Sequence, residues 1–301
     1  MKQLTITLSL ALASIGSCYA TNVPNKLWYN KPAYAFEESL PIGNGKLGAL
    51  VYGGAQNDSI QLNDITLWTG IPVNPNEGGD SYKWISKIRE ALFKEDYKTA
   101  DSLQHYVQGH NSEYYQPLGM INIKDLNPGN ATNYYRELSL DNSIATSQYQ
   151  RNGINYTKEY FASHPDKMIA IKLSASQKEA INSEISLTSL IPHQVKASQK
   201  QLTMTGHVLG EEENSIHYCA ILQVKNTDGE VWASDSTIHL KGVSEAIIYL
   251  VNESSYNGFD KHPVKEGAPY IDKVTDEAWH LANYTYKEFR QRHIADYQEL
   301  F

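Results

Sequence analysis

The chain has 301 residues and a formal net charge of −8, and its lysines and arginines are scattered along the sequence. A chain of this length can hold one large domain or two small ones, and one large domain with appended helices fits best. Because the sequence has no basic stripe to meet phosphates, its composition argues against nucleic acid as a partner and favours a neutral ligand.

The first 20 residues have the pattern of a secretory signal peptide. One early cation, Lys2, precedes an apolar run over 4–16, and the cleavage pattern Cys18-Tyr19-Ala20, with small residues at 18 and 20, predicts cleavage after Ala20. The alternative is a loose lipobox over 15–18, in which Cys18 would carry a lipid anchor. In both cases we expect an exported protein that is periplasmic, on the cell surface or extracellular.

The rest of the chain predicts neither a membrane span nor a disulfide. No other apolar run approaches the roughly 18 residues that cross a bilayer. After removal of the signal, Cys219 is the only thiol, so no intramolecular disulfide is expected. The stability of the mature chain must therefore come from a packed core.

Short β-rich runs, bounded by Gly, Asn, Asp and Pro, dominate the sequence. Many of them alternate apolar and polar residues, and together they predict a mainly β fold, a large antiparallel β-sandwich. Asn152-Gly153 and Asp228-Gly229 each lie between two runs and predict tight turns with antiparallel neighbours. The runs cover 47–52, 59–62, 121–123, 136–140, 144–149, 154–161, 168–173, 181–187, 201–206, 215–224, 231–234, 236–240 and 245–251.

One insertion between strands has helical periodicity. From Ser81 to Val107 apolar residues recur mostly at spacings of three and four, with a break near Asp96. This pattern predicts a helical insertion over about 81–108.

A second helical segment is predicted from about Asp276 to Phe301, where aromatic and apolar residues form one face. That face needs a surface to pack against. The segment reaches Phe301 without a glycine cap, cations in its last turn or a proline, so we expect the helix to continue beyond it. We expect the sandwich to cover 21–272 and a helical linker to begin over 273–301.

The most distinctive segment runs from Pro41 to Gly48. Its three glycines permit positive φ angles, which suit a tight turn into a strand more often than a ligand loop. The spacing of Gly-Asn-Gly-Lys does not match a phosphate loop. Further on, Trp68 has Asn63 and Asp64 nearby, and we expect it to serve an interface with another domain first, the core second and sugar contact last.

Six blocks, in order along the chain, resemble the glycoside hydrolases of family 95, whose best known members are inverting 1,2-α-L-fucosidases. The resemblance extends from Leu27 to Phe301. The chain departs from the pattern at two positions, since members often have Glu where Asp64 stands and an acidic residue where Met120 stands. The blocks are PIGNG at 41–45, QLNDITLWTG at 61–70, YQPLG at 115–119, YRELSL at 135–140, YFASHPD at 160–166 and HIADYQELF at 293–301.

The resemblance implies an N-terminal β-sandwich and the start of a helical linker, ahead of an absent (α/α)6 barrel that carries the catalytic residues. A fucosylated glycan would then be bound through that barrel, and this chain alone would be inactive. Asn44 and Gly45, together with Asn63, Asp64 and Trp68, would contribute to a substrate-binding or barrel-interface surface.

The residues themselves identify no catalytic group. Inverting glycoside hydrolysis needs two carboxyl groups about 6.5–9.5 Å apart, which sequence spacing cannot show, and no acidic residue is singled out. No histidine or cysteine spacing matches a zinc site, and no Gly-x-Ser-x-Gly elbow presents a nucleophile. We expect no metal and no other cofactor.

Two other functions stay open at this point. Some members of the family resemble α-L-galactosidases, and a barrel residue would decide between the sugars. The chain could also be a stand-alone carbohydrate-binding module. The aromatic helix up to Phe301 argues against this, because a finished module should not expose it.

Overall fold

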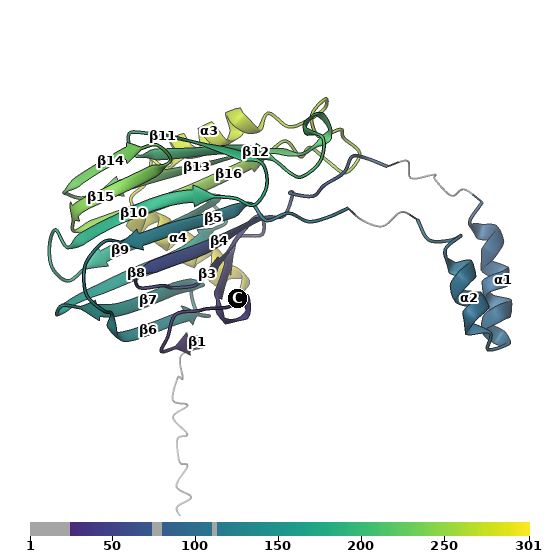
Figure 1. The fold of residues 1–301 in the computed structure, drawn as a ribbon, viewed down its shortest axis with the longest axis horizontal. Helices are drawn as coiled ribbons and strands as arrows, with labels where there is room; N and C mark the ends of the chain where they lie inside the picture. The colour runs from purple at the N-terminus through teal and green to yellow at the C-terminus, as the bar shows by residue number, and fades with distance from the viewer. Residues whose placement is uncertain (1–24, 74–79, 110–112) are drawn as a thin grey trace, which may run out of the picture.

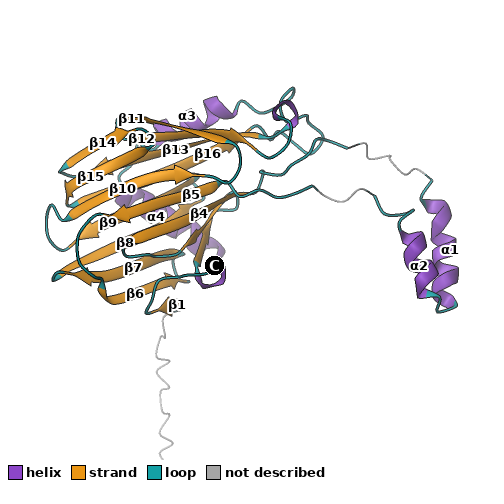
Figure 2. Ribbon diagram, in the orientation of Figure 1, coloured by secondary structure: helices purple, strands orange, loops and turns teal. Residues whose placement is uncertain are grey.

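The computed structural model describes residues 25–73, 80–109 and 113–301, and the predicted signal segment with Cys18 lies outside these ranges. Two antiparallel sheets pack face to face, with two helices behind the larger sheet (Figures 1 and 2). This arrangement confirms the predicted mainly β sandwich. In the three ranges, no helix has the length and apolar character needed to span a membrane.

The larger sheet has nine strands and the smaller has seven. In both sheets, neighbouring strands pair in the antiparallel direction. In spatial order the larger sheet contains β1 (Lys26–Tyr29), β6 (Thr132–Ser139), β7 (Ile144–Arg151), β8 (Ile154–Ser163), β9 (Met168–Ala175), β16 (Glu245–Ser254), β13 (His217–Asn226), β12 (Gln201–His207) and β11 (His193–Ser198). The smaller contains β14 (Glu230–Ser234), β15 (Thr237–Val243), β10 (Ile181–Thr188), β5 (Gly119–Asp125), β4 (Asn57–Asp64), β3 (Leu47–Val51) and β2 (Leu40–Gly43). Two 3-10 turns occur at Phe36–Glu38 and Glu212–Asn214.

The main hydrophobic core lies between the sheets. Alternate residues of a strand point to opposite faces, so β4 buries Asp58, Ile60, Leu62 and Asp64, while the residues between them are half-buried. β12 does the same with Leu202 and Met204. The alternation read from the sequence therefore corresponds to one buried face on each sheet.

Two helices cover the outer face of the larger sheet. They are α3 (Tyr270–His280) and α4 (Tyr286–Leu300), and α4 begins at a capping box formed by Thr285 and Glu288. Phe289 is fully buried there, in a second apolar cluster. β13 and β16 are consequently buried on both faces, which explains their continuous apolar runs.

The prediction of one helix from about Asp276 was wrong. The segment forms two helices, because the chain turns between His280 and Thr285. Its aromatic face finds the surface that it needs on this chain's own sheet, through Tyr286 and Phe289. Trp279, an aromatic residue of the segment that we expected to form one face, does not join this packing and is exposed.

The helical insertion is confirmed with its break. It contains α1 (Tyr82–Phe93) and α2 (Tyr97–Gln104), and the Asp96 carboxylate accepts a hydrogen bond from the Thr99 N–H at 3.1 Å. Asp96 therefore begins the second helix as its N-cap. Figure 1 shows the two helices standing side by side, away from the sandwich.

The turn at Asn152-Gly153 joins β7 to β8 with positive φ at both residues, as predicted. The pairing predicted around Asp228-Gly229 was wrong, because the chain there leaves β13 in the larger sheet and enters β14 in the smaller one. β13 already has β12 and β16 on its two sides, so it has no free edge. Asp228 instead accepts hydrogen bonds from the Ser244 N–H and hydroxyl, at 2.6 and 2.5 Å.

Candidate functional site

The segment from Pro41 to Gly48 forms a tight β-hairpin between β2 and β3. The side-chain oxygen of Asn44 accepts hydrogen bonds from the main-chain N–H groups of Lys46 and Leu47, at 3.1 and 2.8 Å. Gly45 has a φ of +89°, a conformation that L side chains rarely adopt. The segment is therefore a structured turn, as the sequence favoured, and its backbone is held by its own side chains.

This turn also reaches the opposite sheet. The Asn44 side-chain N–H donates to the Ser163 carbonyl at 2.9 Å, and the Lys46 ammonium donates to the Asn252 carbonyl at 2.9 Å. Lys46 also forms an ion pair with Glu253. We call this end of the sandwich, where the turn meets Ser163, Asp64 and Asn252, the hairpin end.

Asp64 is fully buried at the hairpin end. Its carboxylate accepts hydrogen bonds from the Thr66 N–H at 2.8 Å, the Thr66 hydroxyl at 2.6 Å and the Asn252 side chain at 2.7 Å. The Thr66 hydroxyl also contacts the Ser254 hydroxyl at 2.6 Å. Because Asp64 ends β4 and Asn252 belongs to β16, this network fastens the two sheets to each other.

Trp68 lies at the surface of the same end. Its side chain is 43% exposed, and its ring meets that of Tyr115 edge-on, with 5.9 Å between centroids. Burial, and then the charge of Asp64, raises the pKa of the Tyr115 hydroxyl to about 12, so it stays protonated. Trp68 is therefore not a core residue, which removes the second of the three roles considered for it.

The structure brings the predicted residues together. Gly48 pairs with Asn63 and Leu47 with Asp64 across β3 and β4, so the turn and the 63–64 segment share one edge. Asn63 is half-buried, and Trp68 follows four residues beyond Asp64. Sequence reasoning missed the partners, namely Lys46, Thr66, Asn252, Glu253 and Ser254. Two of the contacts span 206 and 188 residues, and no local pattern signals them.

A carboxyl pair lies next to this network. Glu277 of α3 faces Glu253, and Lys167 lies 3.4 Å from the Glu277 carboxylate. Burial first, and the Glu253 charge second, raises the pKa of Glu277 to about 7, against the opposing effect of Lys46 and Lys167. The pair joins α3 to the hairpin end.

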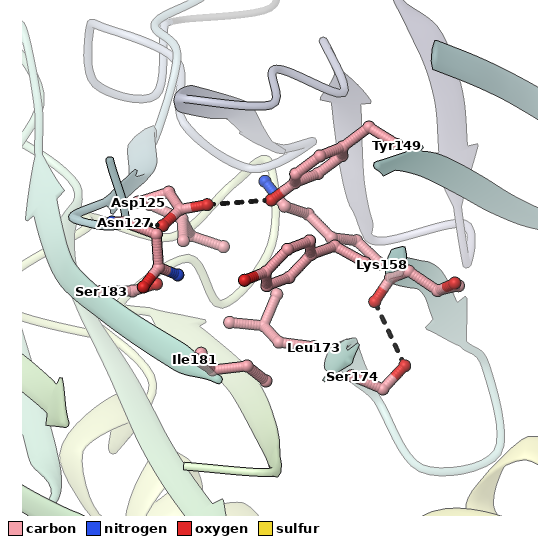
Figure 3. Close-up of a pocket in the computed structure, with 11 residues that line it drawn as sticks. Asp125, Asn127, Tyr149, Lys158, Leu173, Ser174, Ile181 and Ser183 are labelled. Atoms are coloured by element: carbon pink, nitrogen blue, oxygen red, sulfur yellow. Dashed lines mark hydrogen bonds between the residues drawn. The ribbon is translucent and has the colours of Figure 1, made fainter. Parts of the chain in front are cut away.

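A small cavity lies at the opposite end of the sandwich (Figure 3). Its volume is about 20 Å³, which holds a water molecule but not a sugar. Tyr149 donates to the buried Asp125 carboxylate at 3.1 Å, and Arg151 forms an ion pair with the same group. Lys158, on its wall, pairs with Asp58 at 3.1 Å. These charges are paired inside the core, which indicates a structural role.

Within the described ranges, no group of three or more His, Cys, Asp or Glu residues is placed to hold a metal ion. The acidic residues near the hairpin end of the sandwich differ in environment. Asp64 is buried and fully engaged, whereas Glu113 lies at the surface and accepts from the Thr69 hydroxyl at 3.0 Å. At the hairpin end, hydrogen bonds therefore connect the two sheets, and the aromatic side chains of Trp68 and Tyr115 remain exposed at the surface.

Comparison with known proteins identifies the fold family. The family model described as glycosyl hydrolase family 65, N-terminal domain, matches residues 27–258. The chain belongs to this family. The match spans both sheets of the glycosyl hydrolase N-terminal domain described above and ends after β16.

Curated relatives carry fucosidase names. The chain is 25% identical to "Alpha-L-fucosidase 2" of Arabidopsis thaliana, over 92% of this chain and 36% of that protein. It is 26% identical to "Probable alpha-fucosidase A" of Aspergillus niger, over 97% of this chain and 39% of that protein. The chain therefore spans less than half the length of these relatives.

Among solved structures, a putative kojibiose phosphorylase from human microbiome aligns with a TM-score of 0.47 and 10% identity, over 91% of this chain and 39% of that chain. The family model and the curated relatives support a glycoside hydrolase N-terminal domain with fucosidase homologues. They do not single out family 95.

Proposed function

We propose that this chain is the N-terminal, non-catalytic β-sandwich of an inverting exo-α-L-fucosidase of family 95 that removes terminal α-L-fucose from glycans. The sandwich would support a catalytic barrel that follows it in a longer protein. Fucosidase relatives that are more than twice as long as the matched region support this proposal. We further propose that the protein is exported, through a signal within residues 1–20.

The observation that carries the proposal is the apolar surface at the hairpin end. Ile65, Trp68, Ile71 and Tyr114 are all substantially exposed there, in the two chain segments that flank the helical insertion. Soluble proteins rarely leave such a cluster uncovered unless it meets a partner or a ligand. Asp64, just beneath, is closed off by three hydrogen bonds, which suits a support rather than a catalytic acid.

The first test follows the product of hydrolysis. The reading frame beyond codon 301 is expressed, and both the longer product and residues 21–301 are incubated with 2′-fucosyllactose. Proton NMR then identifies the first sugar released. We expect β-L-fucose from the longer product, because inversion changes the anomer, and no release by residues 21–301. Turnover by residues 21–301, or α-L-fucose as the first product, would contradict the proposal.

The second test addresses the interface. Trp68→Ala in the longer product should lower its melting temperature, while the same change in residues 21–301 should have little effect because the side chain is exposed there. Trp28→Ala is the matched control, since Trp28 is 58% exposed on β1, at the edge of the larger sheet. Equal effects of Trp68→Ala in both proteins would argue against an interface at this surface.

A further inference from the structure

A groove follows the outer face of the larger sheet beside α3. Its central part has a volume of about 630 Å³ and lies over β12 and β13. A second hollow of about 510 Å³ adjoins it and shares Thr205 with it. This second hollow includes His217, whose carbonyl accepts a hydrogen bond from the Ser255 N–H at 2.8 Å, so the groove begins next to the hairpin end.

The two walls of the central part differ in chemistry. The strands contribute hydroxyl and amide groups from Gln201, Thr203, Thr205 and Gln223, whereas α3 contributes mainly apolar surface that includes Trp279. The central part has no acidic residue in its lining, and Lys196 is its single charged group. An apolar plane opposite a row of uncharged polar groups is the arrangement that binds a sugar, which has an apolar face and a rim of hydroxyls.

The polar wall is ordered before any ligand arrives. The Gln223 amide donates to the Gln201 side-chain oxygen at 3.0 Å, and the Gln201 amide donates to the Thr203 hydroxyl at 3.0 Å. The Thr203 hydroxyl thereby keeps its own proton for another acceptor. Within the described residues, the Thr205 hydroxyl has no hydrogen-bond partner and stays available to a ligand.

Trp279 differs from every other tryptophan of the chain. Its side chain is 74% exposed, and its ring meets no other aromatic ring in the described residues. The other four each pack on a ring, as Trp28–Tyr135, Trp68–Tyr115, Trp84–Tyr106 and Trp232–His239. An uncovered indole that borders a groove is the feature of this surface that packing within the chain does not explain.

We propose that this groove binds a stretch of glycan chain, with one sugar ring stacked on Trp279 and its hydroxyls bonded to Thr203 and Thr205. The low charge of the lining of the central part favours an uncharged glycan over an acidic peptide or a nucleic acid. The proposal stands on the chain's own surface and does not depend on fucosidase activity.

Binding is measured on the purified chain by affinity electrophoresis in gels that contain xyloglucan, an uncharged polysaccharide, or alginate, an acidic one. We expect retardation by xyloglucan and none by alginate. Trp279→Ala should weaken retardation about tenfold, and Thr205→Val, which replaces a hydroxyl with a methyl, about threefold. Trp28→Ala is the matched control and should bind like the wild type.

Several results would overturn the proposal. They are wild-type protein that migrates alike in all gels, Trp279→Ala that keeps full binding, and Trp28→Ala that loses as much binding as Trp279→Ala. Retardation by alginate alone would assign the groove to acidic ligands instead. A dimer in size-exclusion chromatography that Trp279→Ala converts to monomer would show that a second copy covers the groove. If Trp279→Ala does not fold, the retardation of Thr205→Val tests the proposal instead, and full binding by that variant would overturn it.

Discussion

Glu277 should make the stability of this chain depend on pH in a defined direction. The residue lies on α3 and faces Glu253 of β16, with Lys46 of the hairpin and Lys167 of the turn after β8 as the nearby cations. Burial and the Glu253 charge raise the pKa of Glu277 from 4.5 to about 7. The change Glu277→Gln keeps the size of the side chain and removes its titration.

The sign follows from proton linkage. Because the pKa of Glu277 is higher in the folded state than in the unfolded state, the folded state binds the proton more tightly. The resulting contribution to stability is therefore lost as the pH rises from about 4.5 through about 7. With about 1.4 kcal/mol per unit, the free energy of unfolding of the wild type should fall by about 2.5 kcal/mol relative to Glu277→Gln between about pH 5 and pH 8.

The assay is urea unfolding, followed by tryptophan fluorescence, at several pH values across that interval. Asp276→Asn is the matched control, since Asp276 is the preceding residue on the same helix and is exposed. Its stability should run parallel to that of the wild type. If the difference between Glu277→Gln and the wild type stays constant with pH, the pKa of Glu277 is not raised in the folded state and the reasoning fails.

Three further predictions concern single residues. Lys46→Met leaves Glu253 without its cation and should lower the free energy of unfolding by about 2 kcal/mol in urea titrations, whereas the exposed Lys83→Met should change it by less than about 0.5. Gly45→Ala should lower the free energy of unfolding by about 1 kcal/mol, because a φ of +89° strains an alanine even though the added methyl group meets no atom. Gly109→Ala, where the added methyl group also meets no atom, is the control and should be near neutral. Burial raises the pKa of the Cys219 thiol from 9.0 to about 11, so a thiol-specific reagent at neutral pH should react about a hundredfold more slowly before unfolding than after it; equal rates would refute this.

The strands that the sequence did not predict are all at sheet edges. β1 and β11 form the two edges of the larger sheet, and β2 forms one edge of the smaller. An edge strand buries less of its surface, so its apolar alternation is weak, and β11 shows this with its exposed and half-buried residues. β2 also contains Pro41, which a central strand would exclude but an edge strand tolerates. Interior strands have a neighbouring strand on each side and bury more of their surface, so their apolar pattern is strong enough to predict them.

The candidate site was only half predictable for a different reason. The glycines and asparagine at 43–45 reveal a turn, because turn chemistry is local. The partners of that turn on β16, the Asn252 main-chain carbonyl and the Glu253 carboxylate, are about two hundred residues away, and no local pattern marks them within a buried strand. The prediction for the C-terminal helices was incomplete for the same reason. Periodicity identified an aromatic face, but it could not show that this face packs on β13 and β16.

Aspartate at position 64, where the resemblance to family 95 led us to expect glutamate more often, has a structural reason in this chain. The Asp64 carboxylate accepts from the N–H of Thr66, two residues ahead, which is the bond that a short acidic side chain makes with its own backbone. The same carboxylate accepts from Asn252 at 2.7 Å in a fully buried position. One more methylene would have to be accommodated between β4 and β16, where the other ties of the hairpin end fix the separation of the sheets. Asp64 thus supplies a carboxylate whose reach matches this particular spacing of the sheets.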